Sequence, residues 1–294
     1  MHEASVSHGA DPLGPVLLIG AHGMLGRSWT DLLQWQGLPH ERMGRAQLDV
    51  ADARQIEHVV TDRYRIIVNC AAWTDVDGAE SHAEEANRIN GDAVAHLADR
   101  CEKTGATLLH YSTDYVFNGQ ATRPYRADDV RDPVNAYGHS KALGEEALAA
   151  SAASWLLIRT SWLYAPWGHN FVRTMAKAVR EKSMVRVVDD QCGRPTSCQH
   201  LATASLKLAH RRVRGIYHVT DGGECTWHGF AHRIGHQINS VCRVDACTSA
   251  AFPRPAARPA YSVLDLQATE RVLGRMPLWE TNLDRVLEEL EPVT

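Results

Sequence analysis

Tyr137 and Lys141 are the residues whose types and spacing point most directly to chemistry. They stand four residues apart in a segment that reads as the start of a helix, so both side chains project from one face. An ammonium held close to a phenol favours the phenolate, and such a phenol can exchange a proton with a carbonyl or alcohol oxygen nearer neutral pH. Exposed helices often carry this pair, so its interpretation depends on the segments that position it.

A glycine-rich turn lies near the start of the chain. Residues 15–19 form an apolar run of strand length, and residues 27–36 have an amphipathic helical pattern. Glycines between them let the backbone approach a pyrophosphate at a helix N-terminus, where free N–H groups and the helix dipole favour anions. The predicted dinucleotide contacts are Gly20, His22, Gly23, Met24, Leu25 and Gly26.

Two further segments would complete this dinucleotide site. A second short strand, residues 41–44, leads to Arg45, Asp49 and Val50, which in a dinucleotide-binding fold lie near the adenosine. Arg45 could meet a 2′-phosphate and Asp49 the adenine amine, although each could equally be a solvated surface charge. A third strand, residues 66–69, ends in small residues that leave room for a cofactor. The contacts predicted there are Cys70, Ala71, Ala72 and Thr74.

Strand and helix patterns alternate through the first half of the chain. A helical pattern over 83–103 is followed by a strand at 107–111, the helix of Tyr137, and a fifth strand at 155–159. Such units with short connections predict an α/β fold with a doubly wound parallel sheet, a Rossmann domain over residues 15–165. Residues 1–14 read as a disordered lead-in.

This alternation changes after about residue 160. One clear strand, 215–219, stands among helical patterns, and a proline-rich loop at 253–259 crosses back toward the cleft. The helical patterns are at 170–181, 199–211, 226–241 and 283–290. We interpret residues 166–294 mainly as a smaller C-terminal substrate-binding domain, a lid over the carboxyl ends of the sheet, with possible crossover segments back to the first domain.

Composition excludes several classes of partner. The 294 residues are 44% hydrophobic with a formal net charge of -4, which suggests neither a nucleic acid nor a membrane surface as the main partner. The sequence shows no secretory signal and no run of membrane-spanning length, so we expect a cytoplasmic protein. Seven cysteines lack metal-ligand spacing and are most simply free thiols, so we predict no metal site.

Several local motifs narrow the interpretation. They are residues 112–117 (STDYVF), 159–162 (RTSW), 170–171 (NF), 190–196 (DQCGRPT) and 258–264 (RPAYSVL). Together with the glycine turn and the Tyr137–Lys141 pair, they resemble the dTDP-4-dehydrorhamnose reductase family of the extended short-chain dehydrogenase/reductases. The resemblance runs from about Val16 to the C-terminus.

This resemblance implies an NAD(P)H-dependent oxidoreductase that reduces the 4-keto group of dTDP-4-dehydrorhamnose to dTDP-L-rhamnose, with NADPH expected and NADH possible. Tyr137 would donate a proton to the growing alkoxide, Thr113 would hydrogen-bond the same oxygen, and Lys141 would hold the nicotinamide ribose. The family likeness implies sugar contacts from Thr113, Asp114 and Trp162, although an aromatic beyond a buried strand is more often a core residue. Weaker candidates for the nucleotide or diphosphate are Asn170, Gln191, Arg194 and Arg258.

The sequence also departs from the family. Some members are dimers bridged by magnesium through carboxylates at positions that here hold Ser28, Gln199 and Glu289. One carboxylate of three is a poor magnesium site, so we expect a monomer or a homodimer without that bridge. Three histidines at helical spacing, His228, His232 and His236, spread over too many turns to bind one ion together, and we interpret them as surface or packing residues.

Other functions stay open at this point. A sugar-nucleotide dehydratase would carry Thr-Asp-Glu where this chain has Tyr115, and an epimerase is opposed only by the more specific reductase motifs. Reductases of neighbouring dTDP-sugars are closer rivals, because one hydroxyl's orientation changes only a few loop contacts. The regulatory subunit of methionine adenosyltransferase also resembles these enzymes and acts by binding a partner.

Overall fold

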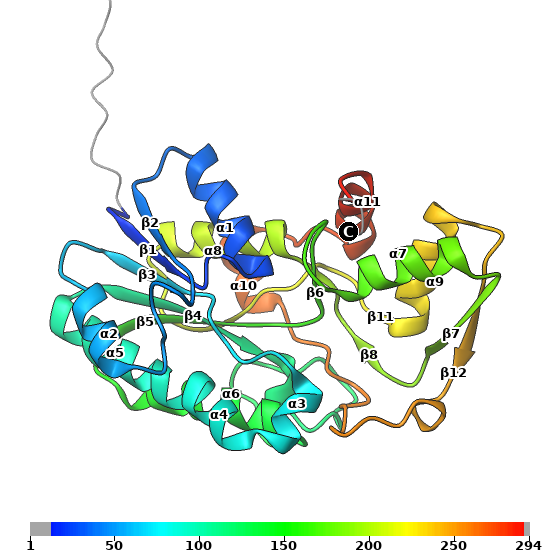
Figure 1. The fold of residues 1–294 in the computed structure, drawn as a ribbon, viewed down its shortest axis with the longest axis horizontal. Helices are drawn as coiled ribbons and strands as arrows, with labels where there is room; N and C mark the ends of the chain where they lie inside the picture. The colour runs from blue at the N-terminus through cyan, green and yellow to red at the C-terminus, as the bar shows by residue number, and fades with distance from the viewer. Residues whose placement is uncertain (1–12, 291–294) are drawn as a thin grey trace, which may run out of the picture.

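The computed structural model describes residues 13–290. Its centre is a six-stranded sheet with the order β10-β5-β4-β3-β1-β2, in which all neighbours run parallel (Figure 1). The strands are β1 (Val16–Ile19), β2 (His40–Met43), β3 (Ile66–Asn69), β4 (Thr107–Thr113), β5 (Ser154–Thr160) and β10 (Gly215–His218). Strand order reverses at β1, so the crevice for a ligand lies at the carboxyl ends there. The predicted doubly wound α/β sheet is confirmed.

Helices cover both faces of this sheet, because parallel strands such as the fully buried β1 and β3 need apolar cover on each side. One face carries α1 (Met24–Trp35) and α8 (Cys198–His210), which contact each other, with α10 (Gln267–Leu273) beside β10. The other face carries α2 (Ala53–Val59), α5 (Ala93–Thr104) and α6 (Ala136–Ala150). A separate apolar core fills each interface.

The helix predicted over 83–103 is interrupted by a π-helical turn, a feature common at functional sites. It consists of α4 (Ala83–Asn87), the π-helix Arg88–Asp92 and α5. The interruption lies where α6 comes closest, since a Cβ on Gly144 would meet the Asn90 carbonyl oxygen at 2.2 Å. Asn90 also bonds the backbone of Trp73 and the Ser140 hydroxyl. The turn therefore ties the loop after β3 to the helix that carries Tyr137.

A smaller group of elements extends beyond the carboxyl ends of the sheet (Figure 1). Its helices are α7 (Phe171–Glu181), α9 (Trp227–Ile238) and α11 (Trp279–Glu288). Its paired strands are β6 (Leu163–Tyr164) with β9 (Thr196–Ser197), β7 (Met184–Val188) with β12 (Arg243–Cys247), and β8 (Cys192–Gly193) with β11 (Cys225–Thr226). Aromatic rings fill its core, where Phe230 packs against Tyr164, Phe171 and Trp279. We refer to this group as the lid.

Several segments after residue 166 belong to the main sheet and not to the lid. The strand predicted at 215–219 as part of the lid is β10, which pairs with β5 and forms one edge of the six-stranded sheet. The helix α8 likewise packs on α1. Strand propensity does not reveal which sheet a strand will join, so this placement could not be read locally. The proline loop also returns to the first half of the chain, where Pro259 lies against Gly119.

The chain ends limit two of the sequence expectations. Residues 1–12 of the predicted lead-in lie outside the described residues, whereas Leu13 is buried in the core beside α1. Three short elements complete the fold, namely α3 (Val76–Ser81) and two 3-10 turns, Asp114–Val116 and Ser249–Ala251. Within residues 13–290 no helix has both the length and the apolar character needed to cross a membrane.

Candidate active site

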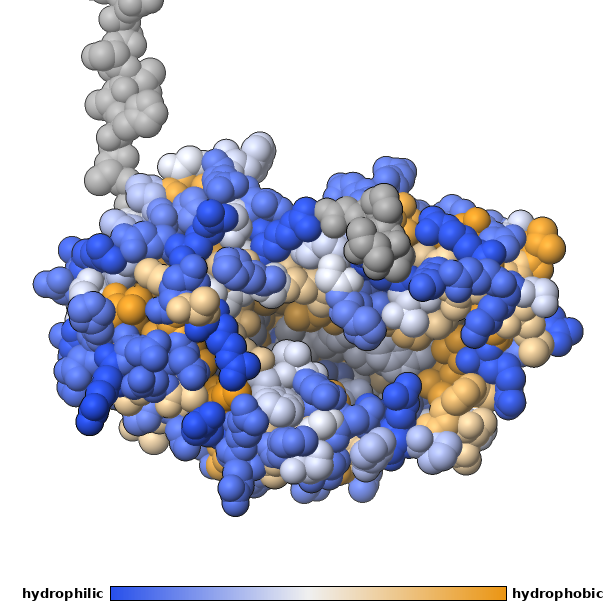
Figure 2. All heavy atoms as spheres, viewed as in Figure 1, coloured by the Kyte–Doolittle hydropathy of each residue, from blue (hydrophilic) through white to orange (hydrophobic). Residues whose placement is uncertain are grey.

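A cavity of about 580 Å³ lies between the sheet and the lid, in the hollow seen in Figure 2. It gathers many of the predicted residues from segments far apart in the chain. Those that line it are Gly23, Met24, Leu25, Cys70, Ala71, Ala72, Thr74, Thr113, Asp114, Tyr137, Lys141 and Trp162. The cavity also has lining residues that the sequence analysis did not assign to the site, among them Tyr111, Tyr115, Ser161, His169 and Trp227.

Tyr137 lies in the first turn of α6, whose start is fixed by two local features. The Asn135 side chain caps the helix by accepting from the Gly138 N–H at 2.7 Å. Gly138 also allows close approach to the loop after β4, because a Cβ there would meet the Tyr115 carbonyl oxygen at 2.1 Å. Burial raises the pKa of Tyr137 to about 12, while the Thr113 hydroxyl lowers this pKa and Asp114 raises it. The phenol is therefore held protonated, as a proton donor to substrate must be.

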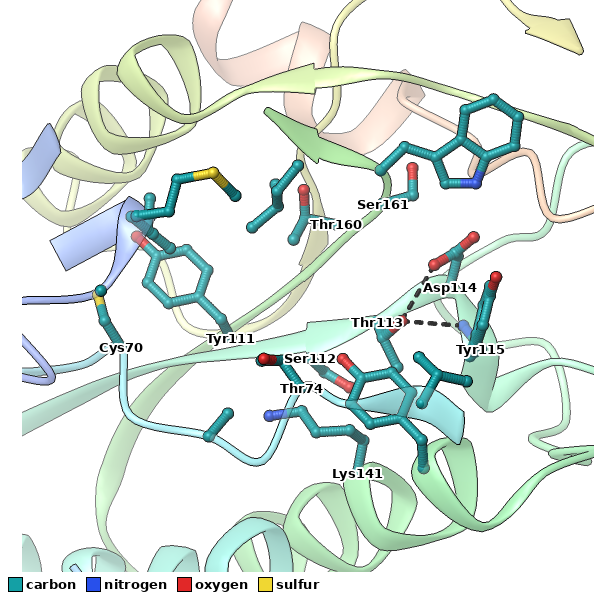
Figure 3. A pocket seen from close by; sticks show the side chains of 18 of the residues that line it. Cys70, Thr74, Tyr111, Ser112, Thr113, Asp114, Tyr115, Lys141, Thr160 and Ser161 are labelled. Carbon is teal, nitrogen blue, oxygen red and sulfur yellow. Dashed lines mark hydrogen bonds between the residues drawn. The ribbon is translucent and has the colours of Figure 1, made fainter. Parts of the chain in front are cut away.

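Thr113 and Asp114 stand at the carboxyl end of β4, beside the cavity (Figure 3). The Thr113 hydroxyl donates to Asp114 Oδ1 at 3.0 Å and accepts from the Tyr115 N–H at 3.1 Å. Burial raises the pKa of Asp114 to about 7, although bonds from Ser262 and Thr113 lower it. Near neutral pH the Asp114 carboxyl can therefore hold a proton, which makes it a second polar group of variable charge in the cavity.

Lys141 is almost fully buried, with 2% of its surface exposed. Burial lowers its pKa to about 8, and the negative charge of Glu145 raises this pKa. The Lys141 ammonium reaches into the cavity from α6 (Figure 3). Its pKa differs enough from that of an ordinary lysine for it to gain and lose a proton in the pH range of the cell.

A buried ion pair holds α6 against the sheet beneath these residues. Glu145 accepts from Arg159 of β5 through both oxygens, at 2.9 Å from Nε and 2.7 Å from Nη2. Ser112 of β4 donates to the same carboxylate at 2.5 Å. Side-chain exposures of 1% for Glu145 and 2% for Arg159 mean that neither charge has solvent as an alternative partner. This bidentate pair therefore fixes the position of the helix that carries Tyr137 and Lys141.

The glycine turn forms a cradle beside the cavity. Gly20 has a φ of 76°, and a Cβ there would meet the Ala71 nitrogen at 2.6 Å, so the turn must pass close to the end of β3. Gly26 is equally constrained, since its Cβ would meet the Gly20 carbonyl at 2.1 Å. A Cβ on Gly23, by contrast, would meet only the Gly20 carbonyl, at 3.3 Å, and Gly23 faces open space. That open face at the start of α1 fits a pyrophosphate.

A second cavity of about 260 Å³ continues from this cradle. It shares Gly23, Cys70, Ala71 and Ala72 with the first cavity, so the two form one elongated space. The predicted adenosine-side residues line it together with the turn, namely Gly20, His22, Arg45, Asp49 and Val50. Asp49 already accepts from the Ala51 N–H, while the exposed Arg45 faces this cavity. The combined length and lining fit a dinucleotide cofactor.

The wall that faces Tyr137 from the lid side is a stack of two indoles. Trp162 has a φ of 47°, unusual for a bulky residue, and its ring stacks on that of Trp227 at 3.6 Å and 10°. Gly193 lies against the same Trp162 ring, since a Cβ there would meet this ring at 2.6 Å. The sequence missed this role of Trp227, whose only local signal is its place just after the helix cap Thr226.

Two of the predicted substrate residues are used to hold the lid together. Asn170 caps α7 by accepting from the Arg173 N–H, and its amide donates to the Ala165 carbonyl. The Gln191 amide donates to Ser249 at 2.8 Å. Neither residue lines the central cavity.

The two predicted arginines also lie elsewhere. Arg258 pairs with Asp77 of α3 at 2.5 and 2.9 Å, so its charge is already matched. Arg194 lines a separate cavity of about 250 Å³ beside Glu270 and Arg275. The structure therefore brings together the predicted catalytic and cofactor residues more completely than the residues suggested for the nucleotide.

The positions compared with the magnesium bridge make direct contacts. The Gln199 amide donates to Glu289 at 2.9 Å, and the buried Ser28 hydroxyl lies 3.5 Å from the Met24 carbonyl oxygen. Among residues 13–290 no group of three His, Cys, Asp or Glu side chains is arranged to hold a metal ion. His228, for example, lies 3.1 Å through Nε2 from the Val244 carbonyl oxygen.

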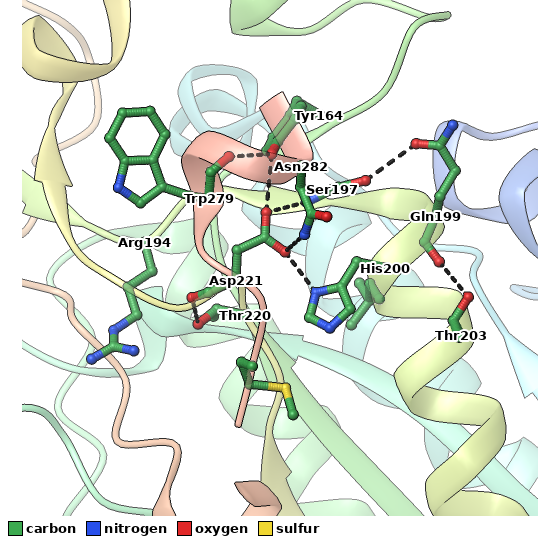
Figure 4. A network of polar contacts seen from close by, with 12 residues as sticks. Tyr164, Arg194, Ser197, Gln199, His200, Thr203, Thr220, Asp221, Trp279 and Asn282 are labelled. Carbon is green, nitrogen blue, oxygen red and sulfur yellow. Dashed lines mark hydrogen bonds and ion pairs between the residues drawn. The ribbon is translucent and has the colours of Figure 1, made fainter. Parts of the chain in front are cut away.

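A buried carboxylate joins the lid to the sheet (Figure 4). Asp221, just beyond β10, contacts His200 of α8 at 2.6 Å and accepts from Asn282 of α11 at 2.8 Å. Its other oxygen accepts from the Tyr164 hydroxyl and the Ser197 N–H. Four other segments, β6, β9, α8 and α11, thus contact this one side chain, which has no exposed surface.

The glycine cradle, the parallel sheet and the Tyr137, Lys141 and Thr113 group define a nucleotide-cofactor-dependent oxidoreductase of the extended short-chain dehydrogenase/reductase type. Residues 14–291 match the family described as RmlD substrate binding domain, and the chain belongs to that family. A dTDP-4-dehydrorhamnose reductase of Streptomyces griseus is 42% identical over 89% of this chain and 88% of its own length. The predicted family resemblance is therefore confirmed.

Two further relatives bear on cofactor and substrate. The crystal structure of a Bacillus anthracis dTDP-4-dehydrorhamnose reductase in complex with NADP has a TM-score of 0.90 and 35% identity, covering 94% of this chain and 99% of that one. A dTDP-4-keto-6-deoxy-D-glucose reductase of Streptomyces niveus is 38% identical over 91% of this chain and 94% of its own length. These similarities favour an enzyme over the regulatory-subunit alternative.

Proposed function

We propose that this chain is an NADPH-dependent reductase of the 4-keto group of dTDP-4-dehydrorhamnose, forming dTDP-L-rhamnose for polysaccharide biosynthesis. One observation carries the proposal: Tyr137, Thr113 and Lys141 line the same cavity that opens onto the Gly23 cradle. The names of the relatives supply the substrate class. Residues 15–165 would mainly hold the cofactor, and residues 166–294 mainly the sugar nucleotide.

The cofactor site is proposed along the elongated space. Bound NADPH supplies the hydride. The N-terminus of α1 at Gly23 would hold the pyrophosphate, Lys141 the nicotinamide ribose, and Arg45 the 2′-phosphate. NADH, which lacks that phosphate, would bind without the Arg45 contact.

Proton delivery is assigned to Tyr137. As the keto oxygen becomes an alkoxide, its negative charge must be neutralised, and the protonated phenol can donate directly to it. The Thr113 hydroxyl, placed beside Tyr137 at the end of β4, would hydrogen-bond the same oxygen. Asp114 and Trp162, which both line the cavity, would contact the sugar.

A second candidate substrate is dTDP-4-keto-6-deoxy-D-glucose, named for the Streptomyces niveus relative. Both sugars present a keto group at the same carbon, and they differ in the orientation of their ring substituents. The Trp162–Trp227 wall would therefore decide between them. We further propose a cytoplasmic monomer or homodimer without a magnesium bridge, which binds no nucleic acid or membrane.

The purified protein can test the proposal directly. Each keto sugar is mixed with NADPH or NADH, and the absorbance of the reduced nicotinamide is followed. We expect the fastest loss of absorbance with dTDP-4-dehydrorhamnose and NADPH. Faster reduction of the gluco-configured sugar would support the second candidate, and a flat signal with both sugars would refute the enzyme proposal.

A further inference from the structure

Three buried side chains, Asn69, His110 and Lys141, form a row from β3 through β4 to α6. The proposed mechanism gives His110, in the middle of this row, no role. The three side chains have exposures of 2%, 1% and 2%. Asn69 Nδ2 lies 3.1 Å from His110 Nδ1, and His110 Nε2 lies 3.4 Å from Lys141 Nζ. The row therefore connects a strand end beside the cofactor site directly to the lysine.

The orientation of the Asn69 amide sets the tautomer of His110. Asn69 Oδ1 accepts from the Ala71 N–H at 3.1 Å, so the amide oxygen points away from the imidazole. The NH₂ group is left to face His110 Nδ1, which must accept and cannot carry a proton. A neutral imidazole with a bare Nδ1 has its proton on Nε2. That N–H points at Lys141.

This arrangement leaves Lys141 facing a donor. An ammonium has three N–H groups and no lone pair, so it cannot accept from His110 Nε2–H. A neutral amine can accept that hydrogen bond. We propose that His110, held by Asn69 in the Nε2–H tautomer, is a positioning residue that favours the neutral amine of Lys141.

Other charged groups around Lys141 act differently. Glu145, one turn further along α6, raises the pKa of Lys141, but its charge is shared with Arg159. Tyr137, one turn before, and the buried Asp114 beyond β4 are held toward their protonated forms. Further charged residues on elements packed against α6 are all at least partly exposed, among them Asp77, Glu80, Glu84, Glu85, Arg88, Asp92, Asp99, Arg100, Glu102 and Lys103. His110 is the group that meets Lys141 from the sheet, and its own pKa is lowered by burial and by Lys141.

A lysine that readily gains and loses a proton can return a proton to the Tyr137 tyrosinate after the reaction. This role rests on the proposed function. After Tyr137 has given its proton to the sugar alkoxide, the Lys141 ammonium passes one proton to the tyrosinate one helical turn away. Lys141 is then a neutral amine that accepts from His110 Nε2–H. A proton from solvent returns it to the ammonium, and the cycle leaves His110 and Asn69 unchanged.

The first test measures the protonation of Lys141 in the free protein, without substrate. The sequence has five lysines, at 103, 141, 177, 182 and 207, so a protein labelled with ¹³C at the lysine ε-carbon gives few signals, and Lys141→Arg identifies the signal of interest. Asn69→Asp places a carboxylate against His110 and draws the imidazole proton to Nδ1. Nε2 then accepts from Lys141, which should bind its proton about tenfold more tightly.

A double variant separates the tautomer from the added charge. In a His110→Phe background the same Asn69→Asp change should lose most of its effect on Lys141, because no imidazole remains to transmit it. His110→Asn provides an uncharged variant that keeps an acceptor for Asn69 but withdraws the Nε2–H, and it should also raise the proton affinity of Lys141. The pH dependence of kcat should follow the Lys141 titration, whereas KM for NADPH should change little with pH.

Two results would overturn the inference. One is an unchanged Lys141 titration in both Asn69→Asp and His110→Asn; the other is an equal effect of Asn69→Asp with and without His110. Because the titration is measured without a sugar, these results are independent of the substrate. A protein that reduced no sugar could still show the predicted titration, and an active enzyme could lack it.

Discussion

The two sides of the cleft, the proposed cofactor side and the lid side, are built from different parts of the chain. On the cofactor side, Gly20 and Gly26 are held by backbone, since any Cβ would collide with main-chain atoms at 2.6 and 2.1 Å. On the lid side the surface is made of side chains, where the Trp162 ring stacks on Trp227 and also lies close to Gly193. A backbone cradle suits a cofactor whose shape is constant. A wall of side chains can be altered by single substitutions, so we expect substrate choice to depend mainly on the lid.

Tyr137→Phe should have the largest effect on this comparison, because it removes the phenol that we propose as the proton donor between the two sides. We expect kcat to fall by about 10²- to 10⁴-fold, while NADPH binding, followed by its fluorescence, stays nearly unchanged. Turnover close to that of the wild type would contradict the role given to this phenol.

Glu145→Gln tests the rigidity of the cofactor side. It leaves the buried Arg159 charge without its ionic partner, so the free energy of unfolding should fall by roughly 3–5 kcal/mol in denaturant titrations. Its neighbour Glu146, which is 58% exposed and pairs with Arg131, is the matched control. Glu146→Gln should change the free energy of unfolding by less than about 1 kcal/mol. Equal changes in the two variants would show that the buried pair contributes no more to stability than the exposed pair.

Asp114 gives a dependence of stability on pH. Its pKa in the folded protein, about 7, lies above the ordinary value of 3.8, so the folded state binds the proton more tightly than the unfolded state. This contribution is present below about pH 4 and is lost as the pH rises toward 7. Asp114→Asn has no carboxyl to ionise, so its free energy of unfolding should not show this decrease. Between pH 4 and pH 7 the variant should therefore become more stable relative to wild type by on the order of a few kcal/mol. Parallel stability curves for the two proteins would refute this assignment.

Gly193→Ala tests the side-chain wall. The added methyl would overlap the Trp162 ring at 2.6 Å and displace it, so KM for the sugar nucleotide should rise about tenfold with NADPH binding preserved. Gly229→Ala, in α9 of the same lid, adds a methyl with ordinary contacts of 3.5 and 3.6 Å and should leave KM unchanged. A weaker affinity of Gly193→Ala for NADPH would contradict this prediction, because the lid wall would then also affect cofactor binding.

Arg45→Ala should give the smallest effect, and it tests whether the proposed cofactor side contacts the 2′-phosphate of NADPH. Loss of one exposed cation should raise KM for NADPH by about five- to tenfold and leave KM for NADH unchanged. The control is Arg42→Ala, an exposed arginine of β2 that does not line the second cavity. An equal loss with both cofactors would argue against a 2′-phosphate contact.

Sequence patterns predicted best those features that depend on local spacing. The glycine turn, the sheet strands and the Tyr137–Lys141 face each follow from a few neighbouring residues, and the structure has all of them. The indole stack was not predictable, because Trp162 and Trp227 are 65 positions apart and each alone looks like a core residue. Spacing also could not show that Arg258, the cation suggested for a phosphate contact, pairs with Asp77, which lies 181 positions away in the chain. Long-range pairing also decided that β10 joins the main sheet.

The contacts of four other segments with Asp221 have a consequence for the way this molecule opens. A lid attached through exposed loops would fluctuate independently of the sheet, with its amides exchanging with solvent at low cost. Here the end of β10 and helix α8 share one carboxylate with Tyr164 and α11 of the lid. Releasing the lid would leave that carboxylate without its donors, so the amides of α11 and α8 should exchange together as one cooperative unit.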